Sequence, residues 1–490
     1  MRRRFIGSHI PVAFLACSFV GVPSVAGQSP APQVPTQAAA PVPAGIALSG
    51  AAQSPFSGGV PSGPKTAGTL ALALSDAIGR GLKFNLGLIL GAQGTRSAEA
   101  ARLQARSALL PNLSAGLSYT SEQEDLKALG FTGGFPGIPT VLGPFGIMDA
   151  RAFLTQQVLN VSAIQNNRAG SYGLRAAQNS YQDARDIVVQ VVASLYLAAV
   201  AGYARIDVTR AQVDTAQALY RRASDMKDAG TVAGIDVLRA QVELQAHRQR
   251  LIFYRNEFEK QKLALARVIG LPIGQAFDLA DPLRFTPLPE MTVEQGVEEA
   301  YRSRFDYRAA QALVSAAEAS KKAAQAERYP SLGVSANYGD IGNHPGGSHG
   351  TYTASAGLTV PIFEGGRSRG DVLQADSLLE RRKSELEDLR SRIDYEIRTA
   401  FLDLRASNDQ VQVARSARDL ATEQLKQAQD RFSDGVANSV EVVQAQEAMA
   451  TADENYIASL FAYNASKVSL ARALGNAEKS SGQLLEVGAH

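Results

Sequence analysis

The chain has 490 residues, in which 49 Lys and Arg side chains nearly balance 47 Asp and Glu side chains. This balance provides no electrostatic attraction for nucleic acid. The one cysteine, Cys17, excludes a disulfide scaffold and Cys-ligated metal sites. The five histidines are scattered and no glycine-rich loop follows a buried strand, so we expect no enzyme, no cofactor and no metal.

The N-terminus has the features of a secretory signal peptide over residues 1–26. Three arginines precede an apolar stretch over residues 11–22 and the small residues Ser24, Val25 and Ala26. Cleavage after Ala26 leaves 46 basic and 47 acidic side chains. A minor alternative is a lipobox over residues 14–17, which would make Cys17 a lipidated N-terminus, although Phe14 is unusual where leucine is preferred.

Residues 27–68 are rich in Pro, Ala, Gly and Ser, which predicts a disordered leader. A helix is predicted from about Leu70, since Leu70, Leu74, Ile78 and Leu82 recur at helical spacing.

Four segments alternate polar and apolar residues, which predicts strands with two differently solvated faces. They are residues 112–120, 147–158, 331–339 and 351–361. Pro361 cannot donate to a sheet, so the last strand should leave its neighbours there. The loop over residues 340–350 carries His344 and His349, which could bind a metal, but a glycine-rich tip is the simpler interpretation.

Long helices follow the strands. Residues 367–433 contain no proline and predict a 67-residue helix of roughly 100 Å. Its seam positions step by three and four residues, as in a coiled coil: Val411, Ala414, Arg418, Ala421, Leu425, Ala428 and Phe432. The apolar residues 187–200 are too few for a membrane span and contain Gln190 and Ser194.

The chain contains an internal repeat. Residues 230–241 match 435–446, and 265–270 match 470–475, both at an offset of 205. We therefore predict a first repeat over 69–270 with a turn at 229–236, and a second over 291–475 with a turn at 434–441. The proline-rich residues 271–290 should connect them, and 476–490 should form a flexible tail.

This arrangement resembles the TolC family of outer-membrane efflux proteins. The resemblance rests on the repeat, on the strand-exit sequence Val360-Pro361-Ile362-Phe363-Glu364-Gly365-Gly366, and on the two turns with Gly followed by Asp-Val or Glu-Val. It implies a mainly α fold with a membrane β-barrel, in which a homotrimer shares 12 strands, four from each chain, and continues as a coiled-coil periplasmic tunnel.

The implied function is that of a passive exit duct in the outer membrane of a Gram-negative bacterium. A periplasmic adaptor and an inner-membrane pump would be its partners, with outer-membrane lipid around the barrel. The alternative is a periplasmic coiled-coil adaptor or scaffold that does not span the membrane. An adaptor normally has one helical hairpin, whereas two are predicted here. The transported substrate and the cognate pump do not follow from the resemblance.

The resemblance also implies functional residues at the two turns and at the strand exit. The gate candidates are Asp236, Glu441 and Gln444, where the family often has a further acid at the Gln444 position. The adaptor-contact candidates are Gly230, Thr231, Val232, Gly435, Val436 and Ala437. The strand-exit residues are Pro361, Phe363, Glu364, Gly365 and Gly366.

A structural role is equally open for the two acids. Asn438 and Glu441 have the spacing of a capping box, and Gly234 would cap the helix that contains Asp236. Phe432 and Ala437 offer no polar group that could hold the mouth closed.

Overall fold

The structure is a computed structural model that describes residues 54–65, 68–130, 137, 139–288, 291–434, 436 and 439–484. All of these residues belong to one compact unit, residues 49–490. The predicted signal peptide, Cys17 and the first part of the leader lie outside the described residues.

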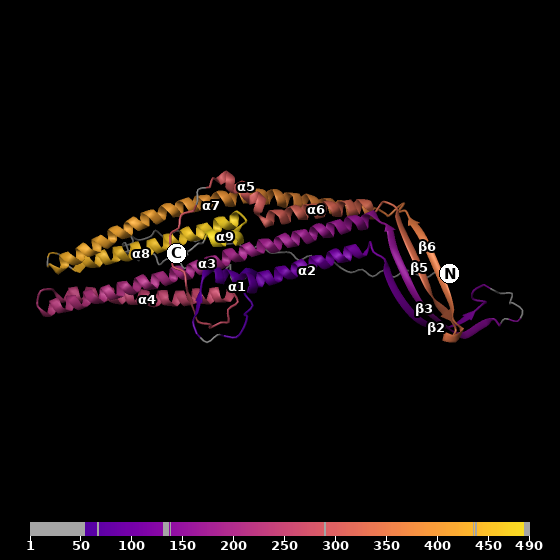
Figure 1. The fold of residues 1–490 in the computed structure, drawn as a ribbon, viewed down its shortest axis with the longest axis horizontal. Coiled ribbons are helices and arrows are strands. Elements are labelled where there is room, and N and C mark those ends of the chain that lie inside the picture. The colour runs from indigo at the N-terminus through magenta and orange to yellow at the C-terminus, as the bar shows by residue number, and fades with distance from the viewer. Residues whose placement is uncertain are drawn as a thin grey trace, which may run out of the picture. The chain divides into compact units, whose positions relative to one another are not determined.

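Four antiparallel strands form one sheet in the order β2-β3-β5-β6 (Figure 1). They are β2 (Asn112–Asp125), β3 (Val141–Leu159), β5 (Ser331–Gly342) and β6 (His349–Thr359). The first three are longer than predicted, because pairing continues into segments that were assigned to loops; Ile341, for example, pairs with His349. The predicted end of β6 at Pro361 was wrong, since the strand ends two residues earlier at Thr359.

The two faces of this sheet differ as the alternation predicts. One face exposes large apolar side chains, between 38% and 78% accessible: Leu113, Leu117, Tyr119, Leu154, Tyr338, Tyr352 and Leu358. The other face carries Arg151, whose guanidinium bonds Asp149 at 3.0 Å, Asn337 at 2.7 Å and Thr351 at 3.1 Å. A sheet with one exposed apolar face and one hydrogen-bonded polar face is suited to separate lipid from water.

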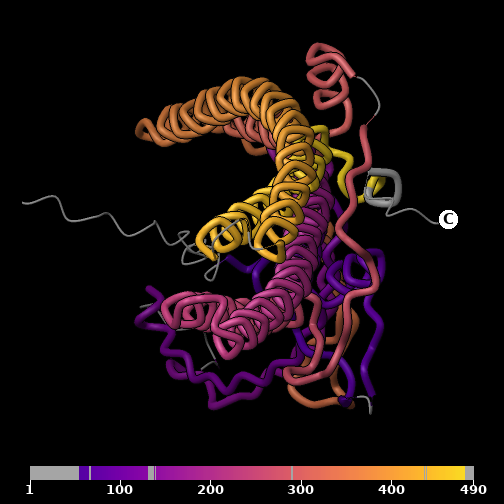
Figure 2. The backbone as a smooth tube through the Cα atoms, turned by 90° about the vertical axis from the view of Figure 1, so that its left-hand side faces the viewer, coloured from indigo at the N-terminus to yellow at the C-terminus, as the bar shows by residue number. Residues whose placement is uncertain are grey.

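Six helices account for most of the helical residues. They are α2 (Leu86–Ser107), α3 (Val161–Asp228), α4 (Gly234–Val268), α6 (Phe305–Ala326), α7 (Arg367–Ser433) and α8 (Ser439–Ala473). The predicted bounds of α7 are confirmed, and Val411, Ala414, Ala421, Ala428 and Phe432 of its seam are buried. Figures 1 and 2 show the hairpin α3–α4 beside the hairpin α7–α8.

The apolar residues 187–200 lie in the middle of α3. Among the described helices, α3 has the length and composition of a membrane span. Its apolar stretch is instead packed in the core, where Val188, Val192 and Ala193 are fully buried. The prediction that this segment does not cross the membrane agrees with this packing, because its apolar side chains are already buried within the protein.

The remaining elements are short. They are β1 (Leu70–Leu72), α1 (Leu74–Phe84), β4 (Phe277–Leu279), α5 (Val293–Ser303), α9 (Ala477–Leu484) and the 3₁₀ turns η2 (Pro55–Ser57) and η3 (Pro345–Gly347). The predicted start of a helix at Leu70 was wrong, because Leu70 begins a strand that pairs in parallel with Phe277 of the connector. The helix begins four residues later.

The described parts of two segments that were expected to be disordered, residues 54–65 of the leader and 476–484 of the tail, contact the folded core. In the leader, the Phe56 carbonyl accepts a hydrogen bond of 2.8 Å from Asn85, and the Phe56 ring packs on the core. In the tail, α9 buries Ala477 and places Glu478 2.5 Å from Arg185 of α3. Composition predicted disorder in both segments, because it does not show contacts with residues that are far away in the sequence.

Candidate functional site

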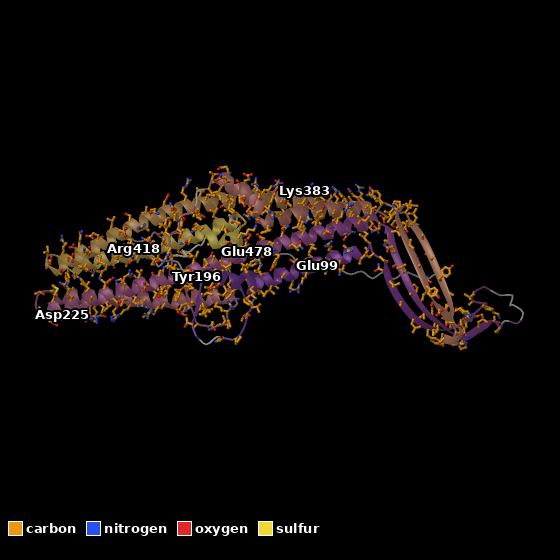
Figure 3. The ribbon with its side chains drawn as sticks, in the orientation of Figure 1. Glu99, Tyr196, Asp225, Lys383, Arg418 and Glu478 are labelled. Atoms are coloured by element: carbon orange, nitrogen blue, oxygen red, sulfur yellow. The ribbon has the colours of Figure 1, made fainter. Side chains whose placement is uncertain are left out.

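The two hairpin turns share one backbone hydrogen bond at equivalent positions. In the first, Thr231 N donates to the Met226 carbonyl at 2.9 Å and Gly230 N donates to Lys227 at 2.9 Å. This is a Schellman motif, which requires a left-handed residue, and Gly230 has a φ of 74°. In the second, Val436 N donates to the Arg431 carbonyl at 3.0 Å, the equivalent bond. Figure 3 shows Asp225, which lies one turn before Gly230, at this end of the helices.

Most of the described turn residues are exposed. Gly230 and Thr231 are exposed, Val232 is half-buried, and Val436 is 71% exposed. A Cβ added at Gly230 would meet nothing within 4 Å, so a side chain there would extend into solvent. Gly435, Ala437 and Asn438 lie outside the described residues, and with them the proposed capping box of Asn438 and Glu441.

Asp236 connects the two hairpins. Its Oδ1 accepts a hydrogen bond of 2.5 Å from the hydroxyl of Ser439, the first residue of α8, and lies 3.3 Å from Arg239. Ser439 is almost fully buried. The expected cap at Gly234 was wrong: Ala233 is the N-cap and Gly234 already has helical geometry, so Asp236 stands at the third helical position.

Glu441 is paired within its own hairpin. Its Oε1 lies 3.1 Å from Arg431 Nε near the end of α7, and both side chains are about half exposed. Gln444, one turn further along α8, is exposed. Neither partner, Ser439 or Arg431, was predicted from the sequence. A serine at a helix start indicates an N-cap, and an arginine in the last turn of a helix indicates an interaction with the helix dipole. Neither pattern predicts a contact with a residue of another helix.

An apolar cluster beneath the turns holds all four long helices together. It consists of Leu219, Ala223, Ala240, Ala428, Phe432, Val442 and Ala445. Phe432 is 3% exposed, so it closes this cluster and does not face the end of the hairpin. The polar contacts of Asp236 and Glu441 therefore lie next to an apolar cluster that holds the four helices together.

The strand exit leads directly from β6 into α7. Gly365 and Gly366 have φ values of 61° and 95°, and Gly366 is the N-cap of α7. Glu364 pairs with Arg367, the first residue of the helix. Ile362 and Phe363 are 95% and 89% exposed. In the first repeat Asn160 replaces the glycines and accepts a hydrogen bond of 2.9 Å from Ala163 N.

Buried charges in the middle of the unit tie α8 and α9 to α3. Arg472 on α8 lies 2.6 Å from Asp183 on α3. Burial raises the pKa of Asp183, partly opposed by Arg472, and burial likewise raises the pKa of Asp186. These pairs are structural links, and the described residues contain no group of three or more His, Cys, Asp or Glu side chains that could hold a metal ion.

Comparison with known proteins identifies the family. The model of the outer membrane efflux protein family matches residues 88–271 and 296–476. The chain belongs to the outer membrane efflux protein family. Each matched segment overlaps one of the two predicted repeats.

Named relatives and solved structures agree with this assignment. The chain is 25% identical over 383 residues to the probable efflux pump outer membrane protein SepC of Pseudomonas putida, covering 76% of each. It is 25% identical over 404 residues to the pyoverdine export outer membrane protein OpmQ of Pseudomonas aeruginosa, covering 79% of this chain and 82% of OpmQ.

Among structures, the CmeC outer membrane channel of Campylobacter jejuni has a TM-score of 0.71 at 18% identity, covering 84% of this chain and 89% of CmeC. The outer membrane protein VceC of Vibrio cholerae has a TM-score of 0.70 at 18% identity, covering 82% and 96%. The expected TolC-like fold is thereby confirmed. This efflux protein is an outer-membrane channel of a Gram-negative bacterium, and the alternative of a periplasmic adaptor is not supported.

Proposed function

We propose that three copies of this chain form the exit duct of a tripartite export system, together with a periplasmic adaptor and an inner-membrane pump. The observation that carries the proposal is the pair of open sheet edges: within the described chain β2 and β6 each pair with one strand only. Unpaired backbone groups are very costly in lipid, so these edges need partners.

Pairing between copies satisfies both edges. The strands alternate in direction, so β6 of one copy runs antiparallel to β2 of the next, and three copies of four strands close a barrel of 12. The exposed apolar face would contact lipid, and the face that carries Arg151 would line the lumen. The long helices would continue the barrel as a tunnel through the periplasm.

The helix turns would form the periplasmic mouth and the adaptor-docking surface. Asp236, Glu441 and Gln444 would face the mouth, with the charge of Glu441 reduced by Arg431 at 3.1 Å. The duct itself would be passive and would need no cofactor or catalytic group. Relatives are named for toluene efflux and for pyoverdine export, so their names do not converge on one substrate.

Fractionation and conductance test this proposal. We expect the protein in the outer-membrane fraction, soluble only in detergent, and we expect purified protein to produce discrete conductance steps in planar bilayers. Deletion of its gene should sensitise cells to the substrates of the cognate pump. Recovery as a soluble periplasmic monomer would contradict the proposal.

A further inference from the structure

A cavity of about 240 Å³ lies between the four long helices, apart from the turns. Its polar lining comes from Gln212 and Thr215 on α3, His247 on α4, Arg418 on α7, and Gln446 and Asp453 on α8. Figure 3 shows Arg418 on the stretch where the two hairpins run together. The cavity is larger than one of about 150 Å³ that holds benzene.

Two buried side chains in this lining have polar atoms without a hydrogen-bond partner. Gln446 is 4% exposed, and neither its amide nitrogen nor its amide oxygen is bonded. His247 is 1% exposed; its Nε2 lies 2.9 Å from Glu243, while Nδ1 is unbonded. In a neutral imidazole that donates through Nε2, Nδ1 is an acceptor. The two side chains therefore present the Gln446 amide as a donor and an acceptor and His247 Nδ1 as a further acceptor, and buried polar groups are rarely left unpaired.

The charges around the cavity are already compensated. Asp453 lies 3.0 Å from Arg418 Nε and 3.5 Å from the Gln212 amide nitrogen. Glu243 is held by His247, and this hydrogen bond lowers the pKa of Glu243, so it stays ionised and occupied. The remaining lining includes apolar side chains, among them Val208, Leu425 and Met449. The site therefore favours an uncharged molecule with an apolar body.

We propose that this cavity binds a small uncharged molecule with a carboxamide-like group on an apolar body. The Gln446 amide would form the two reciprocal hydrogen bonds of an amide pair, and His247 Nδ1 would accept the second N–H of the ligand. The apolar body would lie against Val208, Leu425 and Met449, whose sulfur makes favourable contacts with aromatic rings. All four long helices line the site, so an occupied site stabilises the contact between the hairpins. The proposal concerns a single chain and does not depend on the trimer.

The repeat supplies a matched control. At the offset of 205 residues, Gln446 corresponds to Gln241 and His247 corresponds to Ala452. Gln241 is exposed on α4, and an alanine replaces the histidine, so the equivalent position in the other repeat lacks this polar lining. The same substitution, Gln to Leu, can thus be made at the site and at a position that shares its ancestry but faces solvent.

Benzamide is the probe, and toluene and benzoate are its matched apolar and anionic analogues. With the full-length protein in detergent, we expect saturable binding by calorimetry with a Kd on the order of 1 mM, and a higher thermal midpoint with benzamide. Toluene and benzoate should bind at least about tenfold more weakly. If toluene binds as tightly as benzamide, or if benzamide binding does not saturate at about 10 mM, the cavity holds hydrocarbon or water. Either result would overturn the proposal.

Substitutions locate the binding. Gln446→Leu should weaken benzamide binding at least about tenfold, whereas Gln241→Leu should leave it unchanged. Ala211→Leu narrows the cavity from a residue exposed on α3 and removes no polar group, so it tests the site if Gln446→Leu does not fold. If benzamide binds equally well to the Ala211→Leu protein, and to the Gln446→Leu protein where that protein folds, benzamide binds outside this cavity. That result would contradict the proposal.

Discussion

At the residue scale, Glu441 does not carry an isolated charge. Its carboxylate lies 3.1 Å from Arg431, so removing either charged side chain changes the net charge at this end of the hairpin. We predict that Glu441→Gln shifts the ion selectivity of the channel toward anions and that Arg431→Gln shifts it toward cations and strengthens block by divalent cations from the periplasmic side. Reversal potentials in planar bilayers measure both shifts.

The double variant is the decisive control. Arg431→Gln with Glu441→Gln removes both charges and should restore selectivity close to that of the wild type. Glu447→Gln removes an exposed acid elsewhere on α8 and should change little. If Glu441→Gln leaves selectivity and block unchanged, Glu441 has a structural role only, and the expected cost is about 1 kcal/mol of stability.

Lys467 on α8 is a buried cation. It is 3% exposed, and its Nζ donates to the Thr286 carbonyl at 3.2 Å. Burial lowers the pKa of Lys467 below its ordinary value of 10.5. The folded chain therefore binds the proton of this ammonium group less tightly than the unfolded chain does. Above about pH 10.5 the side chain is neutral in both states and its burial carries no charge penalty. The fold loses stability as the pH falls through the pKa of the folded state, because Lys467 then becomes charged.

We therefore predict that Lys467→Met raises the thermal midpoint at pH 7, and that its advantage over the wild type shrinks as the pH approaches 10. Thermal unfolding across this pH range in detergent measures the effect. The same substitution at Lys426, which is exposed on α7, should show no such pH dependence. A lower midpoint for Lys467→Met at neutral pH would contradict the argument.

At the scale of elements, Tyr196 anchors the connector to α3. Its Oη lies 2.8 Å from Asp281 Oδ2 and 3.0 Å from the Leu72 carbonyl oxygen, and Asp281 also accepts from Leu74 N at 2.8 Å. Burial and the bond to Asp281 raise the pKa of Tyr196, which therefore stays protonated. Tyr196→Phe should destabilise the fold by about 1–3 kcal/mol, because it removes the hydrogen bonds of the Tyr196 hydroxyl, including the one that it accepts from Asp281 N at 3.3 Å. Chemical denaturation measures this, with the exposed Tyr203→Phe as control.

The helix turns are the elements through which we expect the adaptor to dock. Lysine at Gly230 and Gly435 should reduce efflux while leaving the protein assembled in the outer membrane. The φ of 74° at Gly230 means that any side chain there adds some strain. Asparagine, which tolerates this conformation, is the control for strain. If the lysine variants assemble and still support full efflux, the turns are not the docking site.

At the scale of the whole molecule, the open edges of the sheet predict contact between copies. If residues 1–26 are removed, the chain has no cysteine, so introduced cysteines report on assembly without background. Cysteines on the polar face of β2, at Ser114 or Ser118, combined with one on β6, at Thr353 or Ser355, should include a pair that forms intermolecular disulfides. Non-reducing electrophoresis should then show trimers.

Pairs placed within the interior strands β3 and β5 provide the control. Thr155 and Ser335 face each other in the same chain, so cysteines there should cross-link without increasing the mass. If no combination across β2 and β6 gives trimers, the barrel would have to close in another way.

The sequence by itself determined the periodic parts of this protein. Alternation of polar and apolar residues located four strands, and the absence of proline with a repeating seam predicted α7 with the bounds that the structure has. These signals are local, because a strand or helix repeats its own period along the chain. The internal repeat and the strand exit then led to the family, whose membership is confirmed.

Only the tertiary structure decided the contacts between distant segments. Asp236 meets Ser439 across 203 residues, and Glu478 meets Arg185 across 293. Composition predicted disorder for the leader and the tail, yet Phe56 and Ala477 are held by packing on the core. Such contacts have no period in the sequence, since a hydrogen bond or a buried side chain needs one partner, and only the folded chain brings that partner within reach.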